Sequence, residues 1–320
     1  MRPGGLATSL QLVCGALLAA CAANAPAPAV DRSPVELFVL GVAQDGGLPH
    51  FGCERACCMA ARGSGRTLWP ACLGVVHHPS GQLLLVEATP RVEEQVALLH
   101  RLAGVEGRAR QPVDAVLLTH AHIGHYLGLA HFGREVASTS EVRTYCSPRM
   151  AAFLSEHGPW KQLLALRQLS LLPQAARAPF SPIPSVTVTA IPVPHRDEFS
   201  DTMAFVIRGP SRAALFVPDI DAWERAPALL QELLDGVDVA YVDGTFFDGR
   251  ELPERSLAEI PHPLMTDTMR RLEDRARAKP GSVRFLHCNH TNPVLHEAAL
   301  VRSIEDRGFA VAQQGERIAL

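Results

Sequence analysis

Three histidines lie within six positions of the segment LLTHAHIGHYLGL, residues 117–129. His120, His122 and His125 come directly after an apolar run that we expect to form a buried strand. Imidazole is the commonest metal ligand among the side chains, so this spacing predicts a site for one metal ion or for two neighbouring ions. The alternative, a cluster of surface histidines, is disfavoured by the buried strand that precedes them.

Further polar residues stand at the ends of later expected strands. His195 follows a strand in IPVPHRDE, Asp219 ends a strand in ALFVPDID, and His287 follows a strand in VRFLHCNH. Taken alone, each is more often an ordinary loop residue than a ligand. In this order, and together with Thr119 and the three histidines, they resemble the metallo-β-lactamase fold superfamily, which carries a Thr-His-x-His-x-Asp-His motif after a strand.

The resemblance implies an α/β protein with the four-layer αββα fold: two mixed sheets face to face, helices outside, and metals at one edge between the sheets. The expected cofactor is zinc, as one or two ions, with iron or manganese as alternatives. The implied ligands are His120, His122 and His195 for a first ion, and His125, Asp219 and His287 for a second ion, with Asp219 bridging the two.

Gly124 stands where the superfamily has the aspartate of this motif. The second site is therefore expected to be weaker, or to be completed by another group, and restoring an acid at this position is expected to raise its occupancy. His290, three residues after His287, is the candidate for the replacement ligand. The alternative for His290 is a residue at the entry of a helix, bonded to the backbone.

Asp243, at the end of a strand in YVDGTFF, and His262, after the loop that follows, could form a proton-relay pair. The carboxylate would fix the imidazole tautomer, and the imidazolium would protonate a leaving group. We therefore take Asp219, Asp243 and His262 as the catalytic candidates. The alternative is that Asp243 caps a turn and His262 merely begins a helix.

A second cluster of metal-binding residue types precedes all of these. His50, Cys53, Cys57 and Cys58 are spaced closely enough for a small structural metal site, because thiolates are good zinc ligands. The alternative is a set of disulfides, together with Cys72, in an oxidising compartment.

The composition sets limits on the function. Apolar residues make up 47% of the 320 residues and charged residues 20%, as in an ordinary globular protein. The formal charge of −3, with no run rich in lysine or arginine, argues against nucleic acid as a partner and favours a small-molecule substrate. No Gly-x-Ser-x-Gly motif supports a serine nucleophile.

The first residues read as a targeting segment. Residues 1–21 combine Arg2, an apolar stretch and LAAC, which resembles the lipobox of bacterial lipoproteins and implies a lipid on Cys21. Cleavage at AANA, a few residues later, is the alternative. Residues 22–34 form an Ala/Pro-rich tether, and residues 35–320 form one metallo-β-lactamase-like domain. The protein is therefore expected in the cell envelope or periplasm, anchored to the membrane by the lipid.

Apolar patterning predicts strands in antiparallel runs with helices between and after them, which favours mixed sheets. A hairpin is expected over 73–88 and another over 309–320, and single helices are expected over 222–234 and 263–278.

The segments VLGVAQDGGLPHFGCERACC, VDGTFF and FLHCNHTNPVLHE also resemble coenzyme PQQ biosynthesis protein B-like members of the superfamily. Those members lack the first two histidines of the metal loop, and this chain has both.

Three functions remain open at this point. The first is a metal-dependent hydrolase that uses a metal-activated water on a small ester, lactone, amide or phosphodiester. The second is an iron-dependent oxygenase or oxidoreductase, as the likeness to PQQ biosynthesis protein B implies. The third is a non-catalytic metal- or ligand-binding lipoprotein of the cell envelope.

Overall fold

The computed structural model describes Met1 and residues 33–251 and 261–320. The elements given below all belong to one unit, Ser33–Leu320. Apart from Met1, the predicted signal peptide lies outside the described residues, and so do Cys21 and the tether as far as residue 32. Among the helices that are described, none has the length and hydropathy needed to cross a bilayer.

Two sheets of seven strands each form the centre of the unit. The first has the order β14-β1-β2-β3-β4-β5-β6, and the second has the order β13-β12-β11-β10-β9-β8-β7. The strands of the first sheet are β1 Val35–Gly41, β2 Cys72–His77, β3 Gln82–Val86, β4 Ala115–Leu117, β5 Val142–Cys146, β6 Leu169–Pro173 and β14 Arg317–Ala319. Those of the second are β7 Pro179–Phe180, β8 Thr187–Val193, β9 Thr202–Arg208, β10 Ala213–Val217, β11 Val239–Asp243, β12 Val283–Leu286 and β13 Ala310–Val311.

Each sheet is mixed, as predicted. In the first sheet β3, β4, β5 and β6 run parallel, whereas β1, β2 and β3 alternate in direction and β14 runs against β1. In the second sheet β10, β11, β12 and β13 run parallel, whereas β7, β8, β9 and β10 alternate.

Both faces of each sheet are buried, and alternate side chains of a strand pack into different apolar clusters. Leu37 and Val39 of β1 belong to the apolar cluster that contains Phe216 of the other sheet, so this cluster fills the space between the sheets. Phe38 and Leu40, which alternate with them, pack in a separate cluster against helices. Strands buried on two faces need near-continuous apolar sequence, and β1 has it.

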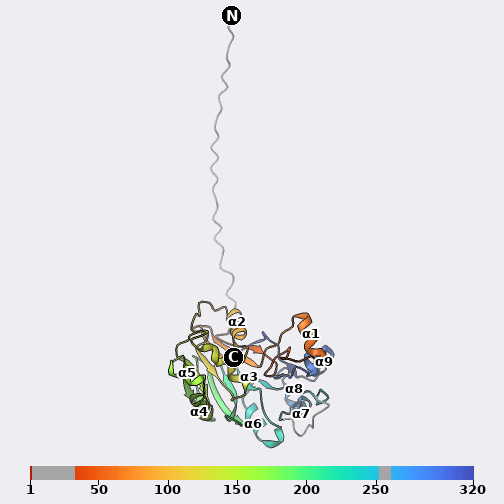
Figure 1. Cartoon of the computed structure of the whole chain (residues 1–320). Helices are drawn as coiled ribbons and strands as arrows, with labels where there is room; N and C mark the ends of the chain where they lie inside the picture. Colours follow the sequence, from red (N-terminus) through yellow and green to blue (C-terminus); the bar gives the residue numbers. More distant parts are fainter. Residues whose placement is uncertain (2–32, 252–260) are drawn as a thin grey trace. The chain divides into compact units, whose positions relative to one another are not determined.

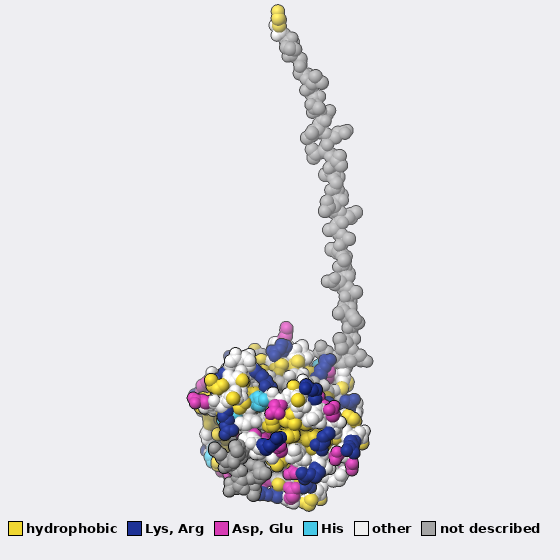
Figure 2. Space-filling model, turned by 90° about the vertical axis from the view of Figure 1, so that its right-hand side faces the viewer, with side chains coloured by type: hydrophobic (Ala, Val, Ile, Leu, Met, Phe, Trp, Pro, Cys, Tyr) yellow, Lys and Arg dark blue, Asp and Glu magenta, His cyan; other side chains and the backbone are white. Residues whose placement is uncertain are grey.

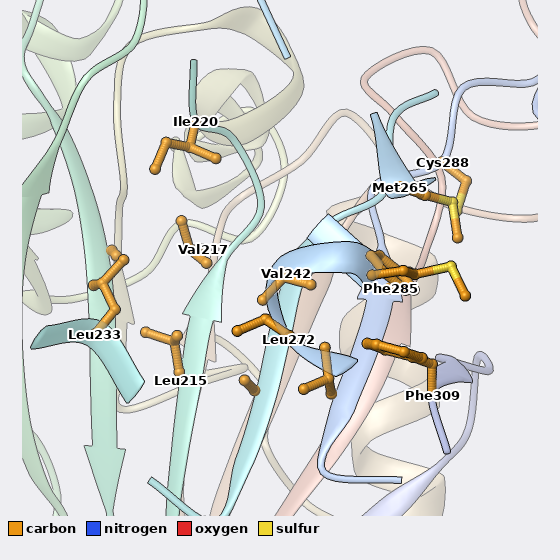
Figure 3. Packing of buried hydrophobic residues seen from close by; sticks show 14 of the residues in the cluster. Leu215, Val217, Ile220, Leu233, Val242, Met265, Leu272, Phe285, Cys288 and Phe309 are labelled. Carbon is orange, nitrogen blue, oxygen red and sulfur yellow. The ribbon is translucent and has the colours of Figure 1, made fainter. Parts of the chain in front are cut away.

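Helices cover the outer faces and complete four layers, which confirms the expected αββα fold. The first sheet is covered by α2 Val92–Ala103, α4 Pro148–Glu156 and α5 Trp160–Ala165. The second is covered by α1 Ala56–Ser64, α6 Leu229–Leu234, α7 Met265–Arg271, α8 Glu273–Ala278 and α9 Ala298–Glu305. Figure 1 shows α4 and α5 on the opposite side from α7 and α8. Figure 3 shows Leu215 and Val242 of the second sheet beside Leu233 of α6 and Leu272, which lies between α7 and α8.

Three of the expected elements differ from the structure. The segment 222–234 is a short 3₁₀ turn, Trp223–Arg225, followed by α6, because Pro227 lies between them and has no backbone N–H to continue a helix. The segment 263–278 divides into α7 and α8. The terminal hairpin is wrong, since β13 pairs with β12 in one sheet and β14 pairs with β1 in the other.

The outer surface carries both signs of charge. On the face drawn in Figure 2, basic and acidic side chains are interspersed among apolar ones. This distribution agrees with the formal charge of −3 for the whole chain.

Candidate metal centre

The candidate residues follow strands whose carboxyl ends lie at one edge of each sheet. In the first sheet β1 and β3 both run against β2, and β4 is parallel to β3. In the second, β8 and β10 both run against β9, and β11 and β12 are parallel to β10. His120 follows β4, His195 follows β8, Asp219 follows β10 and His287 follows β12. Ligand sites of α/β proteins are commonly built at such carboxyl ends.

The first predicted set converges. One ring nitrogen from each of His120, His122 and His195 lies within 4.8 Å of the others, and His120 Nε2 is 2.8 Å from His122 Nδ1. His120 and His195 are buried, and His122 is half-buried. Three neutral imidazole nitrogens aimed at one point are the ligand set of an open tetrahedral zinc site.

Each of these three imidazoles has its other ring nitrogen beside an oxygen of a neighbouring side chain. Such partners fix the tautomer and the orientation of a ligating histidine. The distances are 2.8 Å from His120 Nδ1 to Thr119 Oγ1, 2.9 Å from His122 Nε2 to Glu198 Oε2, and 3.3 Å from His195 Nδ1 to Asp221 Oδ1.

Asp219 lies between this set and the second one. Its Oδ2 is 2.9 Å from His125 Nε2 and 3.3 Å from His287 Nε2, and its Oδ1 is 3.7 Å from His195 Nε2. Burial opposes ionisation of Asp219, but His287 and His125 beside it hold the pKa of the carboxyl well below its ordinary value. A buried carboxylate that reaches both sets with different oxygens is placed to bridge two cations.

Five buried polar atoms of this centre make no well-aligned hydrogen bond within the described residues, although some of them lie close to one another. They are Oδ1 of Asp45, Oδ2 of Asp219, and Nε2 of His125, His195 and His287. Buried polar atoms without partners are rare, because each costs free energy. Coordination to divalent cations would satisfy these atoms, and nitrogen and carboxylate donors suit zinc, iron or manganese. The residues therefore fit a metal centre.

His287 is held in place by Thr245. The Thr245 hydroxyl donates to Asp243 Oδ1 at 2.7 Å, so it can only accept from His287 Nδ1–H, which lies 3.0 Å away. This leaves the lone pair of Nε2 facing Asp219. His287 also adopts a left-handed backbone with φ of +61°, which is uncommon for residues other than glycine.

Asp243 and His262 come together as the sequence predicts. His262 Nδ1 is 2.8 Å from Asp243 Oδ2 and 3.7 Å from Asp219 Oδ1. Burial would lower the pKa of His262, but the carboxylates of Asp243, Asp219 and Asp45 outweigh it and raise this pKa to about 9. These carboxylates favour the protonated form of the imidazole.

Two acids at the centre were not expected from the sequence. Asp45 Oδ1 lies 3.3 Å from His125 Nε2 and 3.7 Å from His287 Nε2. Glu87, which is fully buried, has Oε1 3.7 Å from His125 Nδ1, a separation too long for a hydrogen bond but close for opposite charges. Asp45 follows the carboxyl end of β1, and Glu87 follows the carboxyl end of β3. This position after a strand is the one feature of the sequence that could have indicated both acids.

The structure brings His290 to the cysteines instead of to Asp219. His290 Nε2 is 3.5 Å from Cys53 Sγ, its ring is 4.5 Å from that of His50, and ligand atoms of Cys53, Cys58 and His290 lie within 4.8 Å of one another. Burial lowers the pKa of His290 to about 4, so its imidazole is neutral and able to ligate.

His50 and Cys57, the other residues of the predicted cysteine cluster, do not belong to this group of ligand atoms. The backbone N–H of His50 donates to Cys58 Sγ at 3.2 Å, and Cys57 packs against the apolar cluster outside the second sheet. The cysteines of the described residues, including Cys72 and Cys288, are all free, so the disulfide alternative is not formed here.

This chain is similar to known proteins over most of its length. The family model of the beta-lactamase superfamily domain matches residues 83–287. The coenzyme PQQ synthesis protein B of Methylobacterium sp. (strain 4-46) is 26% identical over 307 residues, which cover 89% of this chain and 100% of that protein.

Two solved structures share the fold. Zinc-bound PqqB from Methylobacterium extorquens has a TM-score of 0.75 at 22% identity, covering 89% of this chain and 100% of that one. A diphosphatase from the PhnP family has a TM-score of 0.63 at 21% identity, covering 89% and 96%. Because the matched family segment spans more than half of the chain and includes both histidine sets, the chain belongs to the metallo-β-lactamase superfamily.

Proposed function

We propose that this protein is a metal-dependent hydrolase that uses a metal-activated water on a small ester, lactone, amide or phosphodiester. The observation that carries the proposal is the position of Asp219 between two sets of imidazoles, with the Asp243–His262 pair 3.7 Å from its other oxygen. A divalent cation, which we expect to be zinc, would supply a water of lowered pKa and polarise the carbonyl or phosphoryl group.

The residues around the centre have separable tasks in such a reaction. His120, His122 and His195 would hold one ion, His125 and His287 would hold a second, and Asp219 would contribute its carboxylate between the two sets. His262 is bonded to Asp243 through Nδ1, so it would pass a proton to the leaving group through Nε2.

Two exposed apolar residues that adjoin residues of the centre in the sequence support a substrate with an apolar part. Ile123 follows His122 directly, and its side chain is 63% exposed. Phe199 follows Glu198, the partner of His122, and is 58% exposed. Exposed apolar residues beside a polar site are a common feature of small-molecule binding.

The test combines metal analysis with a substrate panel. Purified protein is analysed for its elements and assayed with nitrophenyl esters, lactones, amides and bis(p-nitrophenyl) phosphate. We expect about one to two zinc ions at the histidine centre and hydrolysis of at least one class. His195→Ala should lower kcat/KM by about 100-fold or more, because it removes a metal ligand. His131→Ala, which changes an exposed histidine paired with Glu93, is the matched control and should keep full activity.

A second candidate function is favoured by the relatives named coenzyme PQQ synthesis protein B, which match about nine-tenths of the chain. It is an iron-dependent oxidation with the same His and Asp ligands. Iron in the purified protein, with oxygen consumed and no hydrolysis of the panel, would favour this function over hydrolysis. Less than about one metal ion per chain at the histidine centre would contradict both.

A further inference from the structure

The space over Gly124 is filled by another part of the chain. A Cβ atom placed on Gly124 would lie 2.6 Å from Cγ and 2.8 Å from Cα of Asp45, and closer still to Asp45 Oδ1. Real Cβ atoms do not approach other heavy atoms so closely. Glycine at position 124 is therefore what allows Asp45 to occupy this place.

Asp45 directs one carboxylate oxygen into the second histidine set. Oδ1 lies 3.3 Å from His125 Nε2 and 3.7 Å from His287 Nε2, and it has no hydrogen-bond partner among the described residues. The same two nitrogens also face Asp219 Oδ2. Each of these two imidazole nitrogens therefore lies within 4 Å of a carboxylate oxygen of Asp45 and of one of Asp219.

The backbone fixes Asp45 there. Beyond the end of β1, the N–H of Gln44 donates to the carbonyl of Cys288 at 2.9 Å, and the N–H of Cys288 donates to the carbonyl of Val42 at 2.9 Å. The Asn289 side chain donates to Gln44 Oε1 at 2.5 Å. These bonds join the loop of Asp45 to the segment that follows β12, so Asp45 and His287 are held together across the two sheets.

Charge balance also favours a second carboxylate. Ligating imidazoles are neutral, so Asp219 alone would leave a buried divalent ion with an uncompensated positive charge. Burying an unbalanced charge is costly. Because Asp219 would be shared between the two ions, Asp45 would give the second ion a negative charge of its own.

We propose that Asp45 is a ligand of the second metal ion and replaces, from a different loop, the carboxylate that the superfamily carries at position 124. Residue 45 lies outside the segment 83–287 that the family model matches. The proposal rests on the metal centre of the proposed function and does not depend on hydrolysis. It also reverses the expectation for Gly124→Asp, because an added side chain would collide with Asp45.

The test measures metal binding directly. Zinc-free protein is titrated with zinc against a chromophoric chelator and, separately, with cobalt, whose visible absorption reports the ligands. Wild type should bind two ions at the histidine centre. Asp45→Asn, which keeps the shape and removes the charge, should retain the first ion and bind the second at least about tenfold more weakly. Asp235→Asn, an exposed aspartate after α6, is the matched control and should bind both ions normally.

A double variant tests the exchange between the two positions. Asp45→Gly with Gly124→Asp should recover the second ion, because it moves the carboxylate back to the position usual in the superfamily. Unchanged affinity for both ions in Asp45→Asn would overturn the proposal, and so would a folded double variant that still lacks the second ion. Since the readout is metal affinity, failure here is distinct from failure to find a hydrolysed substrate.

Discussion

At the scale of single residues, His262 is the side chain whose role is most open to measurement. It shares a hydrogen bond of 2.8 Å with Asp243, and the pair is buried beside Asp219. A general acid matters most when the leaving group is a poor one, because a good leaving group departs without a proton. The strength of its effect should therefore depend on the substrate.

His262→Ala should lower kcat by about 100-fold or more for a substrate with an alkoxide or amine leaving group. For a nitrophenyl ester or phosphodiester with the same acyl or phosphoryl part, the loss should be much smaller. Zinc content by elemental analysis should stay at the wild-type value. Equal losses for both leaving groups would contradict a proton-donor role and indicate that His262 only shapes the centre.

The residues of the centre differ in how far the sequence could reveal them. His120, His122 and His195 were visible because their types and their positions after strands both pointed to metal binding. Asp45 was missed because it stands in a glycine-rich loop, and its contact with His125 depends on the order in which β1, β2, β3 and β4 pair within the first sheet. His290 was placed wrongly, since spacing along the chain does not show to which side a loop turns after His287.

At the scale of elements, the ends of the strands determine the centre. Parallel neighbours β10, β11 and β12 end at one edge and there present Asp219, Asp243 and His287. Apolar runs made these strands predictable. The sequence could not show that the short strands β13 and β14 pair with other strands instead of with each other. Tertiary packing decides which partner a terminal strand takes.

The helix α1 was not predicted, because its first residues belong to a segment that we expected to be a loop. It begins at Ala56, carries Cys58 into the apolar cluster outside the second sheet, and places it near Cys53 and His290. His290 lies three residues after His287. A metal ion held by these side chains would join α1 to the strand end that carries a residue of the main centre.

Cys53→Ser and Cys58→Ser should each lower the zinc content by about one ion per chain and lower Tm, since a structural zinc site adds directly to folding stability. Each kcal/mol lost should shift Tm by roughly 2–4 °C for a unit of this size. Cys146→Ala, which removes a buried thiol in β5, should lower Tm without lowering the zinc content. Variants of Cys53 and Cys58 with unchanged zinc content would contradict the structural site.

At the scale of the whole molecule, we expect the metallo-β-lactamase-like unit and the first residues to make separate contributions. The unit Ser33–Leu320 contains both sheets and every residue of the two metal clusters. The segment before it supplies the predicted signal and tether. Activity and metal binding should therefore be independent of where the chain is anchored, and location should depend on Cys21.

Expression of the full chain in a bacterial host should give a mature protein that begins at Cys21 and carries a diacylglyceryl group on its sulfur. Cys21→Ser should move the protein from the membrane fraction to the soluble fraction without changing its zinc affinity, because a lipid anchor acts only through the hydrophobic effect on the bilayer. Cys14→Ser, within the same segment, is the control and should leave the protein in the membrane fraction. Intact mass spectrometry decides between the two forms: a mature start after AANA, with no added lipid mass, would contradict the anchor.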